Sequence, residues 1–372
     1  MNTTIKKKAA LIELGGSHAE CLYAQISFLH HAQYEVHVIC NRHLWPLLER
    51  MEGITGHQLH DIDASSKSRM RAVRAIKTYL RQHGIQRAVI NTTEATGIRE
   101  LALGLLFRKI SLTGLVHNAR KLNKGFTLRK LTGLKMKKFF VLNDAQLPHI
   151  HPPKGATVRS FYPAFFPQPG PLPAGEGPAP KAPGECWVCI PGSIELGRRD
   201  YPALLDQLEK QGLPANMKLI FLGGYDPEQA TLRHSNLAMQ LGRLPFQDQL
   251  VTFAPGLVPQ PVFDAWLRQA DAILPLLHPG VDKFAEYHTT RISGAYNLSF
   301  GYRIPLLMED SFASWEDLRR HAVFYQAAEL VALLHKLAAN PALLREKAAG
   351  IATDPKFSFE TQCQRYLALV EQ

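Results

Sequence analysis

The sequence predicts an α/β protein built from two Rossmann-like, doubly wound domains that face each other across a cleft. Three observations support this prediction. The chain has 372 residues, which is more than one hydrophobic core usually serves. Short apolar segments alternate with longer amphipathic segments in both halves, a pattern typical of parallel sheets with crossover helices. A proline-rich segment separates the two halves.

The proline-rich segment sets the expected domain boundaries. Residues 163–185 contain eight prolines, and such a composition favours a semi-rigid spacer without regular structure. We expect an N-terminal domain over residues 1–165, a linker over 166–185 and a C-terminal domain over 186–355. The remaining helical stretch, 356–372, is expected to pack back on the N-terminal domain.

Each domain is expected to contain five strands with helices between them. Apolar runs bounded by turn residues predict strands at 8–14, 34–40, 87–92, 112–117 and 138–143, and then at 186–192, 217–224, 251–256, 272–277 and 304–308. Amphipathic spacing predicts helices at 19–31, 68–84, 96–108, 202–211, 226–241, 261–270 and 294–301. From residue 329 the chain is expected to be helical to its end, with breaks near Pro341 and Pro355.

The positive charge of the chain is concentrated in the first domain. The net charge is +11, of which residues 1–165 contribute about +15 and the remainder about −4. Residues 101–143 contain no acidic residue and ten lysines or arginines. Such a field attracts an anionic membrane surface, nucleic acid or a phosphorylated acceptor. A solvated basic face without a partner is the alternative.

Composition and cysteine usage favour a cytoplasmic protein. No apolar run approaches the roughly 18 residues that span a bilayer, and the basic N-terminus leads directly into the first strand and not into a signal peptide. The five cysteines do not suggest a disulfide framework. Cys186 and Cys189 form a CxxC within an apolar run, and we interpret them as buried strand residues and not as a redox or zinc motif.

The first candidate binding element is the loop that follows the first strand. Gly15, Gly16, Ser17 and His18 lie between that strand and a helix, where glycines allow close approach of a ligand and the helix start offers free N–H groups. A tight structural turn is the simpler alternative. His117 ends a later strand, so it is expected at the same crevice, where a neutral imidazole could bind a sugar hydroxyl or a developing charge.

Strand-end loops in the second half repeat this arrangement. Gly192 and Ser193 follow one strand, and Arg198 or Arg199 close behind could bind a diphosphate through bidentate hydrogen bonds. Gly224 ends the next strand. Gly256 and Leu257 follow a third, where main-chain groups could contact a nucleotide base.

The strongest local pattern in the second half is HTTRISGAYNLSFGYRIPLL. It places Thr290, Arg291, Ser293 and Gly294 immediately before a helix that contains Asn297. A hydroxyl and a glycine at a helix start, with a cation beside them, are expected to bind phosphate, and Arg291 is expected to support the reaction electrostatically. Ordinary N-capping by Ser293 would explain the serine alone.

In this order, these stretches resemble the donor-binding domain of retaining GT-B glycosyltransferases of the family 4 type. The matching segments are GSIELGRRDYPALL, MKLIFLGG, LVTFAPGLVPQPVFDAWLRQADAILPLL and SGAYNLSFGYRIPLL. With the GGSH loop and His117 they cover most of the chain. The resemblance implies a nucleotide-sugar donor, transfer without a metal and retention of anomeric configuration. It also implies that Arg198 or Arg199 replaces the family's phosphate-binding lysine, and that His117 is the family's cleft histidine.

The chain departs from that family at its paired glutamates. Thr290 and Leu298 occupy the two positions, so Asn297 and the loop 290–294 are expected to supply the ribose and sugar contacts. The DxD at Asp61 and Asp63 could hold a divalent cation in a single-domain transferase, but it lies in a polar connection outside the expected cleft. His149 and His151 lack partner ligands, so no metal site is expected.

We therefore expect a glycosyltransferase that moves a sugar from a nucleoside-diphosphate sugar to a glycan, a lipid-linked acceptor or another cell-surface acceptor, as in polysaccharide biosynthesis. His117, His18 and Arg291 are the expected catalytic residues, and no cofactor is expected. The basic domain is expected to attach to the inner membrane leaflet, and nucleic acid is not the expected partner. A sugar-nucleotide epimerase of the same fold, or a non-catalytic protein that binds polyanions or membranes, is the alternative.

Overall fold

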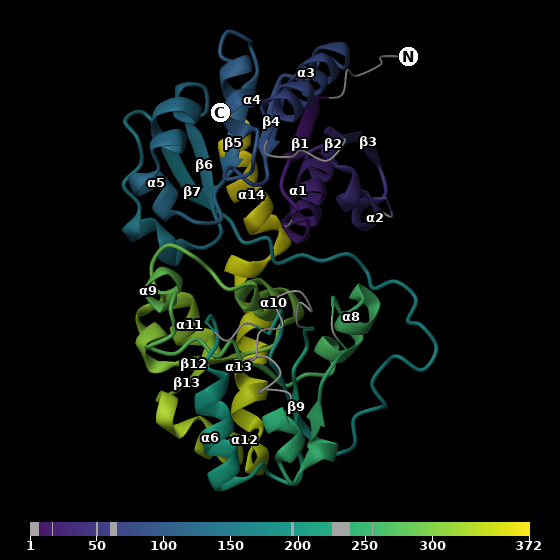
Figure 1. Cartoon of the computed structure of the whole chain (residues 1–372), viewed down its shortest axis with the longest axis vertical. Coiled ribbons are helices and arrows are strands. Elements are labelled where there is room, and N and C mark those ends of the chain that lie inside the picture. Colours follow the sequence, from purple (N-terminus) through teal and green to yellow (C-terminus); the bar gives the residue numbers. More distant parts are fainter. Residues whose placement is uncertain are drawn as a thin grey trace. The chain divides into compact units, whose positions relative to one another are not determined.

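The computed structural model describes residues 7–16, 18–49, 51–59, 65–194, 197–224, 239–254 and 256–372. The chain divides into two compact units, each of which is described by itself (Figure 1). The first comprises Met1–Pro167, Thr289–Ile292 and Ser358–Gln372. The second comprises Gln168–His288 and Ser293–Phe357. The short segment Thr289–Ile292 was expected within the C-terminal domain, and its contacts place it in the first unit instead.

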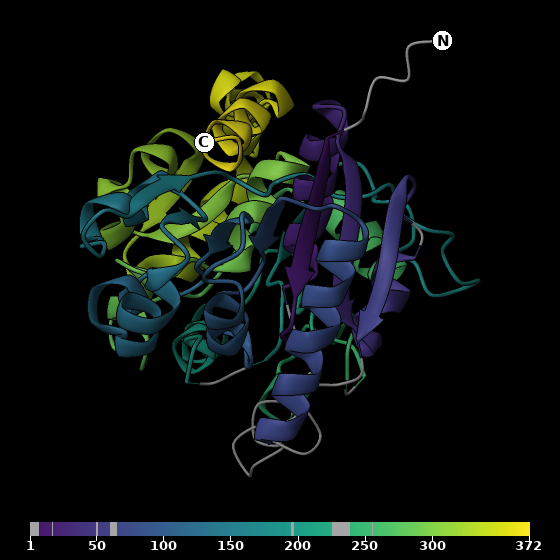
Figure 2. The ribbon, with the colours of Figure 1, turned by 90° about the horizontal axis from the view of Figure 1, so that it is seen from above.

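The first unit contains a seven-stranded parallel sheet with the order β3-β2-β1-β4-β5-β6-β7. Its strands are β1 (Lys8–Glu13), β2 (Glu35–Asn41), β3 (Ile54–Leu59), β4 (Arg87–Ile90), β5 (Ser111–Leu115), β6 (Lys138–Val141) and β7 (Thr157–Ser160). Its helices are α1 (Glu20–His31), α2 (Trp45–Leu48), α3 (Ser66–Gln82), α4 (Ile98–Gly104), α5 (Arg120–Lys124) and α14 (Phe359–Val370). Seen from above, the purple strands at the N-terminal side of the sheet run side by side (Figure 2).

Alternate residues of β1 are buried in opposite layers of the first unit. Ala9 and Leu11 face a core that includes α1 and α14, whereas Ala10 and Ile12 face a core that includes α3 and α4. Both faces of this strand are therefore dry, which explains its continuous apolar run.

The second unit contains a six-stranded parallel sheet with the order β10-β9-β8-β11-β12-β13. The strands are β8 (Cys186–Cys189), β9 (Met217–Ile220), β10 (Leu250–Val251), β11 (Ala272–Ile273), β12 (Leu306–Glu309) and β13 (Ala322–Tyr325). The helices are α6 (Tyr201–Gln211), α8 (Gln260–Arg268), α9 (Phe284–Tyr287), α10 (Gly294–Tyr302), α11 (Glu316–His321), α12 (Leu330–Ala339) and α13 (Ala342–Thr353). The prediction of two doubly wound α/β halves is confirmed.

Three strands, β3, β7 and β13, were not expected from the sequence, and all three lie at sheet edges. Edge strands pair on one side only, and β3 and β7 carry exposed polar positions in place of an apolar run. Most of the helix expected at 226–241 lies outside the described residues. Residues 161–185, all of which are described, contain no helix or strand, in keeping with their prolines.

The five cysteines are buried and unpaired, and Cys186 and Cys189 lie in β8. Burial raises the pKa of the Cys186 thiol to about 12, so the CxxC has none of the thiolate character of a redox motif. Among the described helices, no single one is long and apolar enough to cross a membrane. One sharply bent pair, Ala327–Ala339 with Ala342–Thr353, meets that test by length and composition only.

Candidate active site

The candidate site of the first unit lies where the strand order of its sheet reverses. The chain moves outward from β1 through β2 to β3 on one side, and from β4 to β7 on the other. The carboxyl ends of β1 and β4 are neighbours, and this switch point is where open α/β sheets form a crevice. Glu13 ends β1, Asn91 and Thr92 follow β4, and His117 follows β5. Four polar residues thus meet at one edge of the sheet.

Glu13 is the buried centre of this group. Its side chain has no exposed surface. One carboxylate oxygen accepts hydrogen bonds from Asn91 Nδ2 and Thr92 Oγ1, both at 2.6 Å, and the other accepts from Gly15 N–H at 2.5 Å. Burial raises the pKa of Glu13, and the hydrogen bonds from Thr92, Asn91 and Gly15 offset only part of that effect.

The loop after β1 is held by amide side chains. Asn91 Nδ2 also donates to the His18 carbonyl at 2.9 Å, and Asn41 Nδ2 donates to the Leu14 carbonyl at 2.7 Å. His18 adopts a φ of 69°, in the left-handed region that is strained for a residue with a side chain. The hydrogen bonds to neighbouring main-chain groups maintain this conformation. Gly16 is exposed within the loop, whereas the predicted binding residue Ser17 lies outside the described residues.

The rings of His18 and His117 are stacked, with centroids 3.7 Å apart and planes inclined by 18°. His117 Nε2 lies 2.8 Å from the Asn91 carbonyl, which can only accept, so Nε2 carries the proton. Burial and the charge of His18 hold the pKa of His117 well below its ordinary value. His117 is therefore neutral near pH 7, and its Nδ1 lone pair remains an acceptor.

His18 has the opposite electrostatic environment. Its Nδ1 lies 3.3 Å from Glu20 Oε1. Burial alone would lower the pKa of His18, but the hydrogen bond and charge of Glu20, with the charges of Glu13 and Glu94, outweigh burial and raise it. The stacked pair thus consists of His117, which stays neutral, and His18, which is protonated more readily.

The segment Thr289–Ile292 brings a third predicted residue to this edge. Ala119 N–H and Gln146 Nε2 both donate to the Thr290 carbonyl, at 2.9 and 2.8 Å. Asn118 and Arg291 form an antiparallel bridge, so the main chain of Arg291 lies beside the residue that follows His117. His18, His117 and Arg291 are therefore gathered in the first unit. Thr290 was expected in a phosphate cradle of the C-terminal domain, but it is buried, and its carbonyl is bonded within the first unit.

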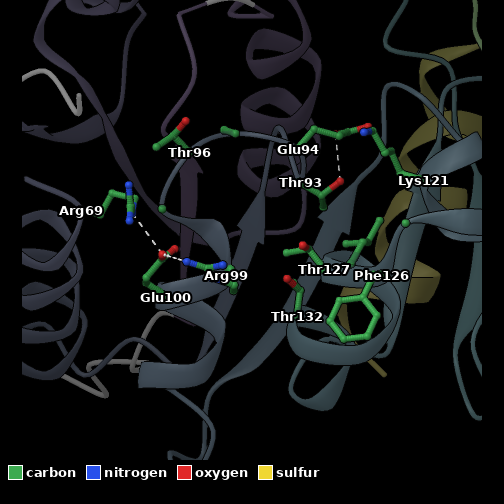
Figure 3. Close-up of a pocket in the computed structure, with 14 residues that line it drawn as sticks. Arg69, Thr93, Glu94, Thr96, Arg99, Glu100, Lys121, Phe126, Thr127 and Thr132 are labelled. Carbon is green, nitrogen blue, oxygen red and sulfur yellow. Dashed lines mark hydrogen bonds and ion pairs between the residues drawn. The ribbon is translucent and has the colours of Figure 1, made fainter. Parts of the chain in front are cut away.

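A pocket of about 500 Å³ opens beside this cluster (Figure 3). Thr93 Oγ1 donates to Glu94 at the pocket wall, and Glu94 also accepts from Asn118 N–H at 2.8 Å. Away from Glu94, the guanidinium groups of Arg69 and Arg99 meet at Glu100 (Figure 3). Lys121 and the largely exposed Phe126 also line the pocket. The pocket is open, and its lining carries positive and negative charges and one aromatic ring.

In the second unit, the strand-end glycines lie against one another. A Cβ added to Gly224 would lie 1.7 Å from the Gly256 carbonyl oxygen, and one added to Gly223 would lie 2.1 Å from the Gly192 oxygen. Gly192 and Gly256 have φ values of 92° and 105°. The loops after β8, β9 and β10 therefore touch through main chain, and Ser193 and Leu257 are both exposed next to these glycines.

The two neighbouring arginines of this unit have different environments. Arg199 is buried and donates to the carbonyls of Pro275, at 2.9 Å, and Pro191, so it joins the ends of β8 and β11. Arg199 therefore has a structural role, whereas the sequence suggested that Arg198 or Arg199 could bind a diphosphate. Arg198 is half-buried, with its guanidinium 5.2 Å from the centre of the Tyr287 ring. Of the two, Arg198 is the one whose position suits an anionic ligand.

The start of α10 has a conventional cap. Ser293 is buried, and its Oγ accepts from Ala295 N–H at 3.4 Å. Gly294 is exposed, and nothing lies within 4 Å of the position that a Cβ would take there. Asn297 is buried, and its Oδ1 has no hydrogen-bond partner within the described part of the chain. A buried amide oxygen without a partner is costly, and a ligand donor at this position would satisfy it.

Sequence reasoning missed Glu13, Asn91 and Glu94. Glu13 offered a signal, since a carboxylate at the end of a buried apolar strand is rarely accidental. Asn91 and Glu94 lie in NTTEATG, at the end of the strand predicted over 87–92, and this strand-end position was a signal that could have identified them. Among the described residues, no group of three or more His, Cys, Asp and Glu side chains is placed to hold a metal ion. The DxD at 61–63 lies outside the described residues.

Comparison of the sequence with protein-family models and with curated proteins finds no match. Solved structures do match over nearly the whole chain. Anabaena Alr3699/HepE, solved in complex with UDP and glucose, is 12% identical, with 98% of this chain and 99% of that chain covered and a TM-score of 0.69. A glycosyltransferase from Rickettsia africae ESF-5 is 11% identical, with coverage of 99% and 98% and a TM-score of 0.68.

A third similar structure has a different description. A Listeria monocytogenes protein described as a UDP-N-acetylglucosamine 2-epimerase is 13% identical, with coverage of 99% and 96% and a TM-score of 0.64. At these identities the similarity shows a common fold of two Rossmann-like domains, the GT-B class.

Proposed function

We propose that this chain is a glycosyltransferase that moves a sugar from a nucleoside-diphosphate sugar to a glycan, lipid-linked or other cell-surface acceptor. The observation that carries the proposal is the stacked pair of His18 and His117 at the switch point of the first sheet. It lies beside a polar pocket that could admit an acceptor. The shared fold supports it, because one similar protein was solved with UDP and glucose and another is described as a glycosyltransferase.

In this proposal the first unit binds the acceptor. The acceptor hydroxyl donates to the free Nδ1 of neutral His117, while Glu13 keeps the loop that carries His18 in place. Arg291, which the main chain places beside Asn118, stabilises charge that develops on the leaving diphosphate. The new bond joins the acceptor oxygen to the anomeric carbon, and the bond from that carbon to the diphosphate oxygen breaks.

The second unit binds the donor. Arg198 contacts the diphosphate, and the touching loops at Gly192, Gly224 and Gly256 let main-chain groups approach the nucleotide. Asn297 Oδ1 accepts a hydrogen bond from a hydroxyl of the sugar or ribose. No metal is required in this scheme, since guanidinium groups neutralise the diphosphate.

Retention of anomeric configuration, which the family resemblance implies, stays a prediction. With retention, the acceptor hydroxyl donates to the departing diphosphate instead of to His117, and its proton passes to that leaving group. With inversion, His117 takes that proton in a single displacement. The anomeric coupling constant of the product, measured by NMR, decides between the two outcomes.

A thermal-shift panel with UDP, GDP, ADP and CMP tests the proposal. A nucleoside diphosphate that binds the native chain at 100 times its Kd stabilises it by about 2.7 kcal/mol. Protection by one of the diphosphates is expected, followed by sugar transfer when the matching donor and an acceptor are added. If none of the four nucleotides raises the melting temperature, the proposal fails, and a non-catalytic binding protein becomes the better explanation.

An epimerase is the second candidate, because the Listeria protein with this fold is described as one and carboxylates lie at the same sheet edge. Omitting the acceptor separates the two functions. An epimerase converts the sugar nucleotide on its own, whereas a transferase leaves it unchanged apart from slow hydrolysis.

A further inference from the structure

A second pocket of the first unit lies at the opposite edge of the sheet from the candidate active site. Its volume is about 540 Å³, and its lining includes Gln86 and Ile110, which immediately precede β4 and β5. The amino ends of these strands form this edge, whereas His117 and Glu13 lie at the carboxyl ends. The pocket is therefore separate from the reacting groups.

The pocket is strongly cationic. Five of its lining residues are lysine or arginine and none is acidic: Arg74, Lys77, Arg81, Arg108 and Lys109. Arg74, Lys77 and Arg81 lie on successive turns of α3, and like charges at such spacing repel each other. Such an arrangement weakens the helix in isolation and favours a bound anion.

Exposed apolar side chains lie close along the chain to residues that line or contact this cationic pocket. Phe107 is 95% exposed, and Leu134 and Leu103 are 54% and 39% exposed. Phe107 immediately precedes Arg108, whose carbonyl accepts from Lys135 Nζ at 2.6 Å. Lys135, which follows Leu134, thus reaches a residue of the pocket. A Cβ added at Gly104, next to Leu103, would lie 3.4 Å from the stem of Lys77.

We propose that this surface, formed by Leu103, Phe107, Leu134 and the five cationic residues of the pocket, docks the protein on an anionic lipid bilayer. Lysine and arginine side chains bind lipid phosphates, and the apolar side chains between them enter the boundary of the acyl chains. A soluble polyanion would use the cations and could stack on Phe107, but it would gain nothing from the aliphatic Leu103 and Leu134. The combination therefore favours a bilayer over nucleic acid.

Co-sedimentation with phosphatidylcholine vesicles, with and without phosphatidylglycerol, tests this proposal in the absence of donor and acceptor. Binding is expected only with phosphatidylglycerol, and it is expected to weaken with salt. The double variant Lys77→Gln/Arg81→Gln should bind roughly 30-fold more weakly, at about fivefold per cation. The double variant Phe107→Ser/Leu134→Ser should lose roughly tenfold or more.

Two substitutions elsewhere serve as matched controls. Leu47→Ser removes another exposed apolar side chain of the first unit, and Lys210→Gln removes an exposed cation of the second. Both should bind vesicles as the unchanged protein does, and melting curves confirm that all variants fold.

Three outcomes would overturn the proposal. The first is equal binding to neutral vesicles, the second is unaltered binding by both double variants, and the third is binding to a single-stranded oligonucleotide but not to vesicles. Transfer to a water-soluble acceptor is measured separately, so failure of membrane docking leaves the proposed catalytic function standing, and the reverse also holds.

Discussion

At the scale of single residues, Asn91 links the candidate catalytic groups. Its side chain donates to Glu13 and to the His18 carbonyl, and its own carbonyl accepts from His117 Nε2. Gln25 Nε2 in turn donates to Asn91 Oδ1 at 2.6 Å. The amide therefore orients both histidines and the buried carboxyl. A network in which every member is bonded holds its groups more rigidly than separate pairs would.

The role of His117 predicts a selective loss of turnover. His117→Gln removes the Nδ1 acceptor and keeps a side chain of similar reach, so kcat should fall by roughly 10²–10⁴, while protection by the nucleoside diphosphate should persist. Steady-state kinetics with a thermal-shift measurement checks both parts. His151→Gln, which alters an exposed histidine of the same unit, is the control. Wild-type turnover in His117→Gln would remove this residue from the mechanism.

Because the pKa of Glu13 is raised, the melting temperature of Glu13→Gln relative to that of the unchanged protein should depend on pH. A carboxyl whose pKa is higher in the folded chain contributes stability below its unfolded value of about 4.5, and this contribution is lost as the pH rises through the folded value. The glutamine variant does not titrate. Its melting temperature relative to the unchanged protein should therefore rise as the pH is raised from about 4.5 to 7.

Melting curves across that pH range test whether the relative melting temperature rises with pH, and Glu52→Gln, at an exposed position, is the comparison. A difference between Glu13→Gln and the unchanged protein that shrinks or stays constant with rising pH would contradict it.

Substitution of the two adjacent arginines should have different effects: one on donor binding, the other on the stability of the fold. Arg198→Gln should raise the donor KM by roughly 10- to 100-fold, the value of a charged hydrogen bond to phosphate, and should lower the melting temperature less than Arg199→Gln does. Arg199→Gln should instead lower the melting temperature, because the carbonyls of Pro191 and Pro275 lose their donor. The exchange of these two phenotypes would show that the assignment is reversed.

At the scale of elements, the central strands were predictable and the edge strands were not. Strands β1, β2, β4, β5 and β6 are apolar because helices cover both sides of the sheet interior. At the edges, β3 and β7 have exposed polar positions, and nothing in their composition distinguishes them from loops. The strand ends that carry site residues could therefore be predicted from the sequence. Which of these ends are neighbours depends on the pairing of β1 with β4, and the sequence does not show that pairing.

Because the strand-end loops of the second unit lie against one another, one added methyl group between them should destabilise the protein. Gly224→Ala would place a Cβ 1.7 Å from the Gly256 oxygen, so the loops after β9 and β10 must move apart. We expect a loss of about 1–3 kcal/mol in stability together with weaker donor binding. Gly242→Ala, where nothing lies within 4 Å of the added Cβ, is the matched control. Denaturant unfolding compares the two, and equal stability would argue against the contact.

At the scale of the whole molecule, the ends of the chain belong to one unit. Helix α14, at the C-terminus, packs in the core that contains α1 and β1. Tyr366 is buried, with its ring 5.2 Å from that of Phe140 and its hydroxyl 3.2 Å from Gln25 Oε1. The first unit is therefore completed only after the second has been synthesised.

This arrangement predicts that a change near the C-terminus destabilises the N-terminal unit. Tyr366→Ala should cost about 3–5 kcal/mol, as expected for loss of a buried aromatic ring. Gln364→Ala, at an exposed position of the same helix, should cost far less. Limited proteolysis with peptide mapping identifies the unit that opens, and cleavage confined to residues 168–288 would contradict the prediction.

Local sequence patterns were enough to predict the α/β class, the central strands and the positions of His18, His117, Gly192, Gly224 and Gly256 at or just after strand ends. These features depend on local composition and periodicity, which each segment carries independently of the rest. The folded chain alone shows that buried Glu13 is bonded to Asn91, that Arg199 joins two strand ends, and that Arg291 lies beside Asn118 in the first unit. Those facts arise from contacts between residues tens to hundreds of positions apart, and no local pattern encodes such contacts.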